Sequence, residues 1–313
     1  MRICINYLER KDALIAPVIF AHRLGRELEK HKDVKIVDRS EKHDILLAII
    51  RDDQIADSHA IGAKVVQRLD GVYHELDNNF LTKNKLIRKT FDEVDAVIYQ
   101  SDFSRKLVNR YFGQNDGLEF IIHNGVDPFE YPASQGKGEG NFLAVAKWAG
   151  RTNKRLKSIV EGFDYANFSG TKLKIVGPVD EGMGSYGNVE FTGPIPNSEI
   201  PSLYRNTNCL IHLCYDDNCP NAVAEALVSE VPVICTSSGG TPELVKDSGE
   251  IIQEDNYDLE PNWRAEIPDV PRDKVAEAIH AFMGHRNYRF PRNDLYMESC
   301  ANNYIEAFEK VLS

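Results

Sequence analysis

The sequence predicts an α/β protein made of two doubly wound parallel sheets. Short β-branched and apolar runs alternate with helical patterns along almost the whole chain, which is typical of βα units. The 313 residues amount to two domains at roughly 150 residues each. A stretch rich in glycine and proline interrupts the alternation. We therefore expect domains at 1–127 and 141–292, a linker at 128–140, and a last segment, 293–313, that forms a helix crossing back to the first domain.

In the first half, the expected strands are short apolar runs bounded by polar residues. They fall at 2–6, 34–37, 44–49, 63–69, 95–100 and 119–123. The first helix follows the first strand, with an apolar stripe at helical spacing formed by Leu14, Val18, Ala21, Leu24 and Leu28. Ser101 or Asp102 is expected to cap the helix 103–112, because an oxygen there can accept a free backbone N–H.

The same alternation restarts after the expected linker. Strands are predicted at 141–146, 172–176, 189–191, 209–213 and 231–235. Helices are predicted at 154–165, 198–205, 220–229, 242–246, 272–283 and 294–312. Ligands of such sheets bind beyond the carboxyl ends of the strands, so the cleft between the two domains is the expected site.

Composition excludes several classes of protein. A net charge of -11 argues against a general nucleic-acid binder, which needs a basic face. The longest apolar run, 45–50, is far shorter than the ~20 residues that cross a bilayer, and the chain starts with a strand pattern instead of a signal peptide. Six cysteines are too sparse for a disulfide scaffold and are expected to be buried free thiols. We expect a cytoplasmic protein that makes at most peripheral membrane contact.

The segment most informative about function is 215–227, which follows a predicted strand and enters a helix. Glu225 stands among apolar residues of that helix, where a carboxylate is costly unless it is hydrogen-bonded. Asn221 lies one turn earlier on the same face, and Asp217 lies just before the helix. These groups are predicted to face one opening. Either sugar hydroxyls or a structural network would satisfy them.

Two further segments are expected to lie beside this one. Gly239 and Gly240 let the backbone approach a ligand closely, and Thr241 is a suitable N-cap for the helix that follows. Lys147 and Lys154 follow the first strand of the second half, where cations suit a diphosphate. The alternatives are a tight strand-to-helix turn and a solvated basic loop.

Together these segments resemble the donor half of a family 4 retaining glycosyltransferase with the GT-B fold. The resemblance rests on two acids separated by seven residues, on a Pro-Val pair, and on a Gly-Gly-x-Pro-Glu turn, at Asp217, Glu225, 232–233 and 239–243. With 124–127 and other short motifs it extends over about residues 95–245. It implies two Rossmann-like domains facing a central cleft.

The resemblance also implies roles for individual residues. Glu225, with Asn221 nearby, would hold the ribose of a nucleotide sugar, and Asp217 would hold the transferred sugar. Lys147 and Lys154 would neutralise the departing diphosphate. The backbone of Gly193, Pro194 and Ile195 would face the base, and that of Gly239, Gly240 and Thr241 would lie close to the phosphates.

The expected function is therefore a retaining, metal-independent glycosyltransferase without a cofactor. It would move a sugar from a UDP- or GDP-type donor to a glycan, lipid or small-molecule acceptor, and Asp70 and His74 are the candidates on the acceptor side. The sequence departs from the family pattern in three respects. Asp217 stands where glutamate is commoner, and Lys147 stands where many members have arginine. The first domain is short and lacks a glycine pair after its first strand. The alternatives are a non-catalytic nucleotide-sugar or glycan-binding protein and a sugar-nucleotide epimerase.

Overall fold

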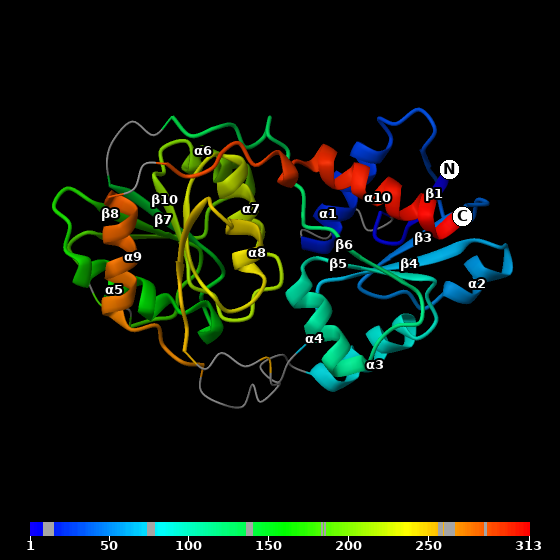
Figure 1. Cartoon of the computed structure of the whole chain (residues 1–313), viewed down its shortest axis with the longest axis horizontal. Helices are drawn as coiled ribbons and strands as arrows, with labels where there is room; N and C mark the ends of the chain where they lie inside the picture. The colour runs from blue at the N-terminus through cyan, green and yellow to red at the C-terminus, as the bar shows by residue number, and fades with distance from the viewer. Residues whose placement is uncertain are drawn as a thin grey trace. The chain divides into compact units, whose positions relative to one another are not determined.

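The computed structural model describes residues 1–8, 16–73, 79–135, 140–182, 184, 186–255, 259, 267–284 and 287–313. The chain forms two compact units, one of Met1–Gly125 with Met297–Ser313 and one of Val126–Tyr296 (Figure 1). Each unit is built on a parallel six-stranded sheet with helices packed on its faces. The predicted fold class of two doubly wound α/β units is confirmed.

The sheet of the first unit has the strand order β2-β1-β3-β4-β5-β6. Its strands are β1 (Arg2–Ile5), β2 (Lys35–Ile36), β3 (Ile45–Ile49), β4 (Lys64–Leu69), β5 (Ala96–Tyr99) and β6 (Leu118–Ile121). Its helices are α1 (Ala16–Leu28), α2 (Ile55–Ala60), α3 (Phe80–Phe91), α4 (Asp102–Phe112) and α10 (Met297–Leu312). The strand order changes direction at β1, so the topological switch point of this unit lies between β1 and β3.

Helix α10 packs beside α1 on one face of this sheet (Figure 1). Its buried stripe consists of Met297, Cys300, Ala301, Tyr304, Ala307, Phe308 and Val311. Gly125 allows the chain to pass this helix closely, because a Cβ at this position would lie 2.7 Å from the Cα of Met297. The C-terminal segment therefore contributes to the core of the first unit.

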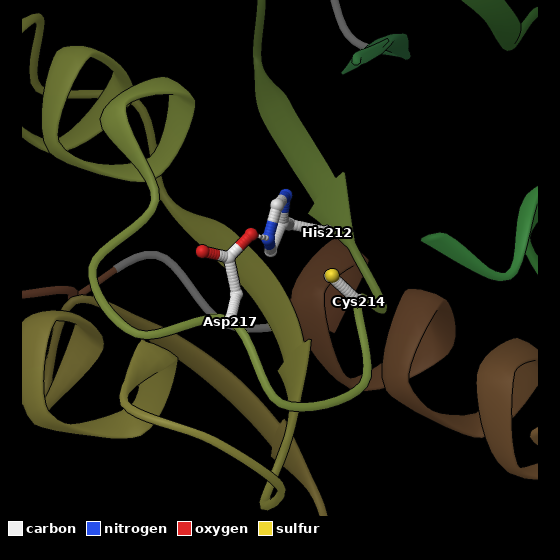
Figure 2. Close-up of side chains that lie close together, drawn as sticks. All are labelled: His212, Cys214 and Asp217. Atoms are coloured by element: carbon white, nitrogen blue, oxygen red, sulfur yellow. Dashed lines mark ion pairs between the residues drawn. The ribbon is translucent and has the colours of Figure 1, made fainter. Parts of the chain in front are cut away.

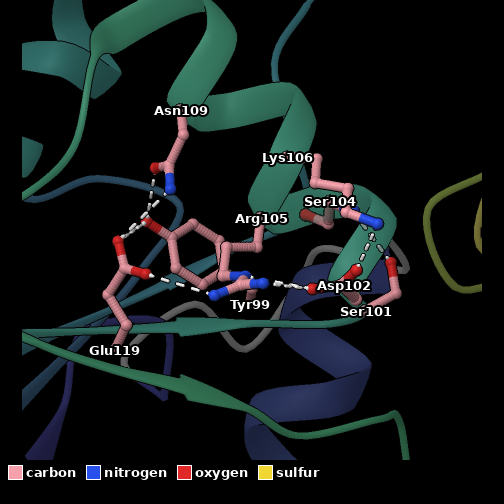
Figure 3. A network of polar contacts seen from close by, with 8 residues as sticks. All are labelled: Tyr99, Ser101, Asp102, Ser104, Arg105, Lys106, Asn109 and Glu119. Carbon is pink, nitrogen blue, oxygen red and sulfur yellow. Dashed lines mark hydrogen bonds and ion pairs between the residues drawn. The ribbon is translucent and has the colours of Figure 1, made fainter. Parts of the chain in front are cut away.

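Polar contacts fix helix α4 on the opposite face (Figure 3). The Ser101 hydroxyl accepts a hydrogen bond from the backbone N–H of Ser104 at 3.0 Å, so Ser101 is the N-cap. The hydroxyl of Tyr99 donates to Glu119 at 3.1 Å and lies equally far from the Asn109 side chain. The network therefore ties α4 to β5 and β6.

The sheet of the second unit has the strand order β12-β11-β10-β7-β8-β9. Its strands are β7 (Asn141–Val145), β8 (Lys172–Val176), β9 (Val189–Gly193), β10 (Cys209–His212), β11 (Val233–Thr236) and β12 (Gly249–Ile252). Its helices are α5 (Leu156–Ala166), α6 (Ile200–Tyr204), α7 (Asn221–Val228), α8 (Thr241–Val245) and α9 (Arg272–Gly284), with short 3-10 turns at Thr152–Lys154, Asn197–Glu199 and Asn293–Leu295. The switch point of this sheet lies between β7 and β10.

Apolar side chains cover both faces of the second sheet. Helices α5 and α9 pack on one face, and α7 and α8 pack on the other (Figure 1). Helices α5 and α9 approach closely at Gly162, where a Cβ would lie 2.4 Å from the Cβ of Val275. The helices on the second face begin at the carboxyl edge of the sheet, so they place their first residues beside the switch point.

The structure differs from the sequence-based expectation in the segment between the domains. Residues 126–135 of the chain, which include most of the predicted linker, belong to the second unit. Tyr131 is buried against Tyr204, with the ring centroids 5.9 Å apart, and the backbone N–H of Ser134 donates to the carbonyl of Ser229 at 2.7 Å. An aromatic anchor and backbone hydrogen bonds thus outweigh the glycine and proline content. Residues 136–139 lie outside the described part of the chain.

Some helix boundaries also differ from those predicted. Thr241 is not the N-cap of α8 but its first residue. Gly240 is the N-cap, and its N–H donates to the carbonyl of Asp217 at 2.7 Å. Helix α7 begins at Asn221, with Pro220 in the capping position. The short elements α2 and β12 were not predicted from the sequence.

All six cysteines lie in the described residues, where each is buried and none forms a disulfide bond. None of the helices in the described ranges is both long and apolar enough to span a bilayer.

Candidate functional site

The carboxyl ends of β7 and β10 bring together a lysine and an aspartate that are 63 residues apart in the chain. Lys154 ends the 3-10 turn after β7, and Asp217 lies in the loop after β10. The Nζ of Lys154 donates to the Oδ2 of Asp217 at 2.7 Å. Their side chains are 24% and 19% exposed, so the ion pair is largely withdrawn from water. This contact lies at the switch point of the second unit, where ligands of doubly wound sheets bind.

His212 and Cys214 complete the surroundings of this ion pair (Figure 2). His212 is the last residue of β10, and its Nε2 lies 3.5 Å from the same Asp217 Oδ2. The sulfur of Cys214 lies beside the ammonium of Lys154. It also accepts a contact from the Asn153 side chain at 3.7 Å.

The charges of this cluster follow from burial and from the ion pair. Burial alone would raise the pKa of Asp217, but the Lys154 charge and the His212 contact outweigh it and hold that pKa well below its usual range. Burial would lower the pKa of Lys154, but the Asp217 carboxylate outweighs it and raises that pKa. Burial lowers the pKa of His212 and raises the pKa of Cys214 to about 12. Near neutral pH the cluster therefore holds one ammonium, one carboxylate, a neutral imidazole and a thiol.

The loop that carries Asp217 is fixed on two sides by backbone contacts. The N–H of Tyr215 donates to the carbonyl of Asn153 at 2.8 Å, and the N–H of Gly240 donates to the carbonyl of Asp217 at 2.7 Å. Gly239 has a positive φ of 77°, and a Cβ there would lie 2.8 Å from the backbone N of Asp217. Only glycine fits this approach without displacing the backbone. The two strand-to-helix turns are therefore in direct contact, as their adjacency in a parallel sheet predicts.

Buried polar atoms at this edge of the sheet lack protein partners. The Nε2 of His212, the Oδ1 of Asn218 and the Oγ1 of Thr241 have no hydrogen-bond partner among the described residues. Buried polar groups in native proteins are nearly always satisfied, by protein, water or ligand. These three atoms, at the end of β10, in the loop after it and at the start of α8, indicate a site that a polar molecule completes.

Glu225 is half-buried on helix α7, and a buried tyrosine lies against it. The hydroxyl of Tyr204 donates to the carbonyl of Ala222 at 3.0 Å and lies 3.4 Å from the Oε2 of Glu225. Burial, with the Glu225 charge, raises the pKa of Tyr204, so the hydroxyl keeps its proton. Asn221, at the start of the same helix, is exposed.

The other residues predicted for the donor side are less closely engaged. Lys147 is exposed, and no described residue forms a hydrogen bond or ion pair with it. Gly193 ends the edge strand β9 with a φ of 70°, and its carbonyl accepts the N–H of Gly177 at 2.9 Å. Pro194 is exposed, whereas Ile195 packs against the core of the second unit. These residues lie at the carboxyl edge of the same sheet as Asp217.

On the first unit, Asp70 belongs to a polar network beyond β4 and β5. Its Oδ1 accepts hydrogen bonds from the Arg68 guanidinium and from the Gln100 side-chain amide. Arg68 also donates to Asn124 at 2.7 Å. Asp70 remains 39% exposed, whereas Arg68 is buried. His74, the second acceptor-side candidate, lies outside the described residues.

A second polar site lies at the switch point of the first unit, next to β1 and β3. A cavity of about 350 Å³ is lined there by Asn6, Tyr7, Arg39, Arg51, Asp52, Asp53 and Gln54. Arg39 forms an ion pair with the nearly buried Asp52, and the Asn6 side chain bridges to the backbone of Ile49 and Arg51. A lining of guanidinium, carboxylate and amide groups suits a hydroxyl-rich molecule better than an apolar one.

Sequence reasoning missed several residues of the candidate site. His212 carries the one visible signal, because it interrupts the otherwise apolar run of β10 and a buried imidazole needs a partner. Cys214 was predicted to be an ordinary buried thiol, and Tyr204 and Asn218 were given no role. Their proximity to the predicted acids depends on strand order and helix packing, which local sequence patterns do not reveal.

Part of the chain is similar to a known protein family. Residues 129–259 match the family model described as Glycosyl transferases group 1. The matched residues lie within the second unit. The ORF31 protein of a virus (isolate Australia/Victoria), which carries the name of a glycosyltransferase, is 36% identical over 63 residues, or 20% of this chain. The match spans about a fifth of that relative's length, 19%.

Solved glycosyltransferase structures resemble the chain over its whole length. A glycosyltransferase from Rickettsia africae has a TM-score of 0.63 at 13% identity, covering 100% of this chain and 98% of its own. Anabaena Alr3699/HepE in complex with UDP-glucose has a TM-score of 0.62 at 14% identity, covering 99% of this chain and 100% of its own. The lipopolysaccharide outer core galactosyltransferase WaaB has a TM-score of 0.65 at 14% identity, covering 99% of both chains. At these identities the likeness shows the fold, which is that of GT-B glycosyltransferases.

Proposed function

We propose that this protein is a glycosyltransferase that moves a sugar from a nucleotide-diphosphate sugar to an acceptor, with retention of the anomeric configuration. The observation that carries the proposal is the Lys154–Asp217 pair at the switch point of a glycosyl transferases group 1 domain. Around it lie buried polar atoms that no described protein group satisfies. A charged, hydroxyl-rich donor would supply the missing partners.

Lys154 is the residue proposed to stabilise the leaving group. A departing diphosphate develops negative charge, and a preorganised cation in a site withdrawn from water stabilises it strongly. Asp217 holds the ammonium in place before the donor binds. Lys147, on the exposed loop after β7, is free to add a second charge.

Asp217 and Glu225 are the proposed ligands of the donor's hydroxyl groups. The second carboxylate oxygen of Asp217 points away from His212, and no described residue donates a hydrogen bond to it (Figure 2). Asp217 would bind the transferred sugar through this oxygen. Glu225, oriented by Tyr204 and aided by Asn221, would bind the ribose. The Gly239–Thr241 turn would approach the phosphates, and the backbone at 193–195 would face the base.

The proposed reaction needs neither a metal ion nor a cofactor. Lysine charge at the diphosphate can replace the Mg²⁺ that other transferases use. The proposed donor is of UDP or GDP type, and the likeness to HepE, which was solved with UDP and with UDP-glucose, favours the uridine nucleotide. We expect the enzyme to act in the cytoplasm with at most peripheral membrane contact.

The acceptor is proposed to bind the first unit, through the Asp70 network and the polar cavity beside β1 and β3. Asp70 keeps an exposed carboxylate that is oriented by Arg68 and Gln100, as a group that positions an acceptor hydroxyl would require. The cavity adds guanidinium and carboxylate groups that can bind a glycan or another small polar acceptor. The sugar part of a lipid-linked acceptor would fit the same chemistry.

Thermal shift with a panel of UDP- and GDP-sugars in the presence of EDTA tests the donor site. A donor at about 100 times its dissociation constant should stabilise the protein by about 2.7 kcal/mol. Glu225→Ala should abolish this shift, whereas the control Glu161→Ala, on the exposed side of α5, should retain it. If no nucleotide sugar at millimolar concentration raises the melting temperature, the donor site is wrong.

Turnover distinguishes the transferase from its two alternatives. A transferase should release the nucleoside diphosphate from the donor, slowly to water and faster with an acceptor. A non-catalytic binding protein would show the thermal shift without any release. An epimerase would convert the sugar while it stays attached to the nucleotide. Retention is read from the anomeric coupling of the product by NMR.

A further inference from the structure

The cluster of His212, Cys214 and Asp217 has the ligand set of a transition-metal site. One ligand atom from each residue, an imidazole nitrogen, a sulfur and a carboxylate oxygen, lies within 4.8 Å of the other two. Imidazole, thiolate and carboxylate are the groups that bind Zn²⁺ in proteins, and three protein ligands leave a fourth position open. Figure 2 shows all three side chains converging at the end of β10.

His212 independently indicates that the cluster lacks a ligand. Its side chain is 6% exposed, and its Nε2 lies 3.5 Å from the Oδ2 of Asp217. No described residue forms a hydrogen bond of normal geometry with this nitrogen. A buried ring nitrogen in this state is costly, and a metal ion would use its lone pair.

The cluster already holds one cation, the ammonium of Lys154. It lies 2.7 Å from Asp217 Oδ2 and beside the sulfur of Cys214. An ammonium only donates hydrogen bonds, and among the described residues it leaves His212 Nε2 without a partner. A soft divalent ion would engage all three groups. The flexible lysine stem, still 24% exposed, gives the ammonium a route to solvent.

We propose that His212, Cys214 and Asp217 bind a soft divalent cation of the Zn²⁺ class in exchange for the Lys154 ammonium, and that the bound metal blocks the donor site. The metal forms bonds to the imidazole nitrogen, the sulfur and the carboxylate. Cys214 releases its proton to the buffer, Lys154 keeps its own, and no electron is transferred. Hard Mg²⁺ prefers oxygen ligands and does not compete. The inhibitory effect rests on the proposed function, whereas metal binding does not.

Titration of the full-length, reduced protein with Co²⁺ and Zn²⁺ tests the proposal. Co²⁺ should produce the charge-transfer absorption of a cobalt–thiolate bond, Zn²⁺ should displace it, and one proton should be released per ion. Cys214→Ser should remove the absorption and weaken Zn²⁺ binding by about tenfold or more. Cys219→Ser is the matched control, because this second buried thiol of the same loop lies outside the cluster, and it should bind like the wild type.

Lys154→Gln tests directly whether the metal ion exchanges with the Lys154 ammonium. Because the metal would no longer displace an ammonium from Asp217, this variant should bind Zn²⁺ about tenfold more tightly than the wild type. Weaker binding by Lys154→Gln would overturn the exchange. Absence of the absorption from the wild type, or its persistence in Cys214→Ser, would overturn the site.

Two further measurements distinguish a failure of the metal site from misfolding of a variant and from a failure of the proposed function. If Cys214→Ser melts without a cooperative transition, His212→Gln takes its place and should weaken Zn²⁺ binding to the same extent. Zn²⁺, but not Mg²⁺, should abolish the thermal shift caused by a nucleotide sugar. If wild-type protein binds Zn²⁺ yet shows no shift with any donor, the proposed function fails and the metal site stands. If donor and Zn²⁺ bind together, the blocking role is overturned.

Discussion

Replacing Lys154 by methionine leaves the Asp217 carboxylate without its main partner, and the structure indicates how large the effect should be. Removing one member of a buried ion pair costs about 3–5 kcal/mol, whereas an exposed pair contributes about 0–1. The two side chains are joined at 2.7 Å and are 24% and 19% exposed, so the pair lies between these limits. We expect Lys154→Met to lower the free energy of unfolding by about 2 kcal/mol.

The reverse change should cost less. In Asp217→Asn the ammonium is left unpaired, but its long stem can carry it to solvent, so the expected loss is about 1 kcal/mol. The double variant removes both charges, and its loss should fall short of the sum by about 1–2 kcal/mol, which is the coupling energy. Urea unfolding followed by tryptophan fluorescence measures all four proteins. Trp148 is buried in the second unit, so its signal follows the unfolding of that unit.

The pH dependence gives an independent test of the same contact. Because the folded pKa of Asp217 is lowered, its contribution is present above the unfolded value of about 3.9 and is lost as the pH falls towards the folded value. Because the folded pKa of Lys154 is raised, its contribution is present below about 10.4 and is lost only as the pH rises further. The stability difference between wild type and Lys154→Met should therefore be constant from about pH 5 to 9 and shrink in acid.

Two results would refute this reasoning. A loss below about 0.5 kcal/mol for Lys154→Met would mean that water screens the pair as it does on an open surface. Additive single losses would mean that the two groups do not interact in the folded protein. In either case the preorganised ammonium required by the proposed function would be absent.

Two more predictions concern the same unit. Tyr204→Phe removes the hydroxyl that donates to the Ala222 carbonyl and contacts Glu225, so the free energy of unfolding should fall by about 1 kcal/mol. The affinity for a nucleotide sugar, measured by calorimetry, should also fall. An unchanged affinity would mean that Tyr204 has a structural role alone. Gly177→Ala places a Cβ 1.8 Å from the Ala146 carbonyl oxygen at a φ of 115°, so it should cost about 3 kcal/mol or more in urea unfolding. In the control Gly187→Ala the new Cβ has nothing within 4 Å, so the free energy of unfolding should change by no more than about 0.5 kcal/mol. Equal losses in the two variants would contradict the close approach of Gly177 to the Ala146 carbonyl.

Local patterns in the chain were sufficient for the fold class and for single elements. The alternation of apolar runs and helical stripes predicts both sheets, since each βα unit carries its own periodicity. The stripe of α10 from Met297 to Val311 is buried as its spacing predicts, and Ser101 caps α4. The two acids and the basic residues were likewise visible, because their spacing lies within short segments.

Long-range packing decided the rest. Tyr131 joins the predicted linker to the second unit because it finds a pocket beside Tyr204, which no local pattern specifies. The sequence alone predicted that the segments of Lys154 and Asp217 lie near each other. Only the order of β7 and β10 in the sheet revealed the direct ion pair and placed His212 and Cys214 around it. Sequence periodicity indicates which face of a helix or strand is apolar. Which other element packs against that face depends on how the whole chain buries its apolar surface.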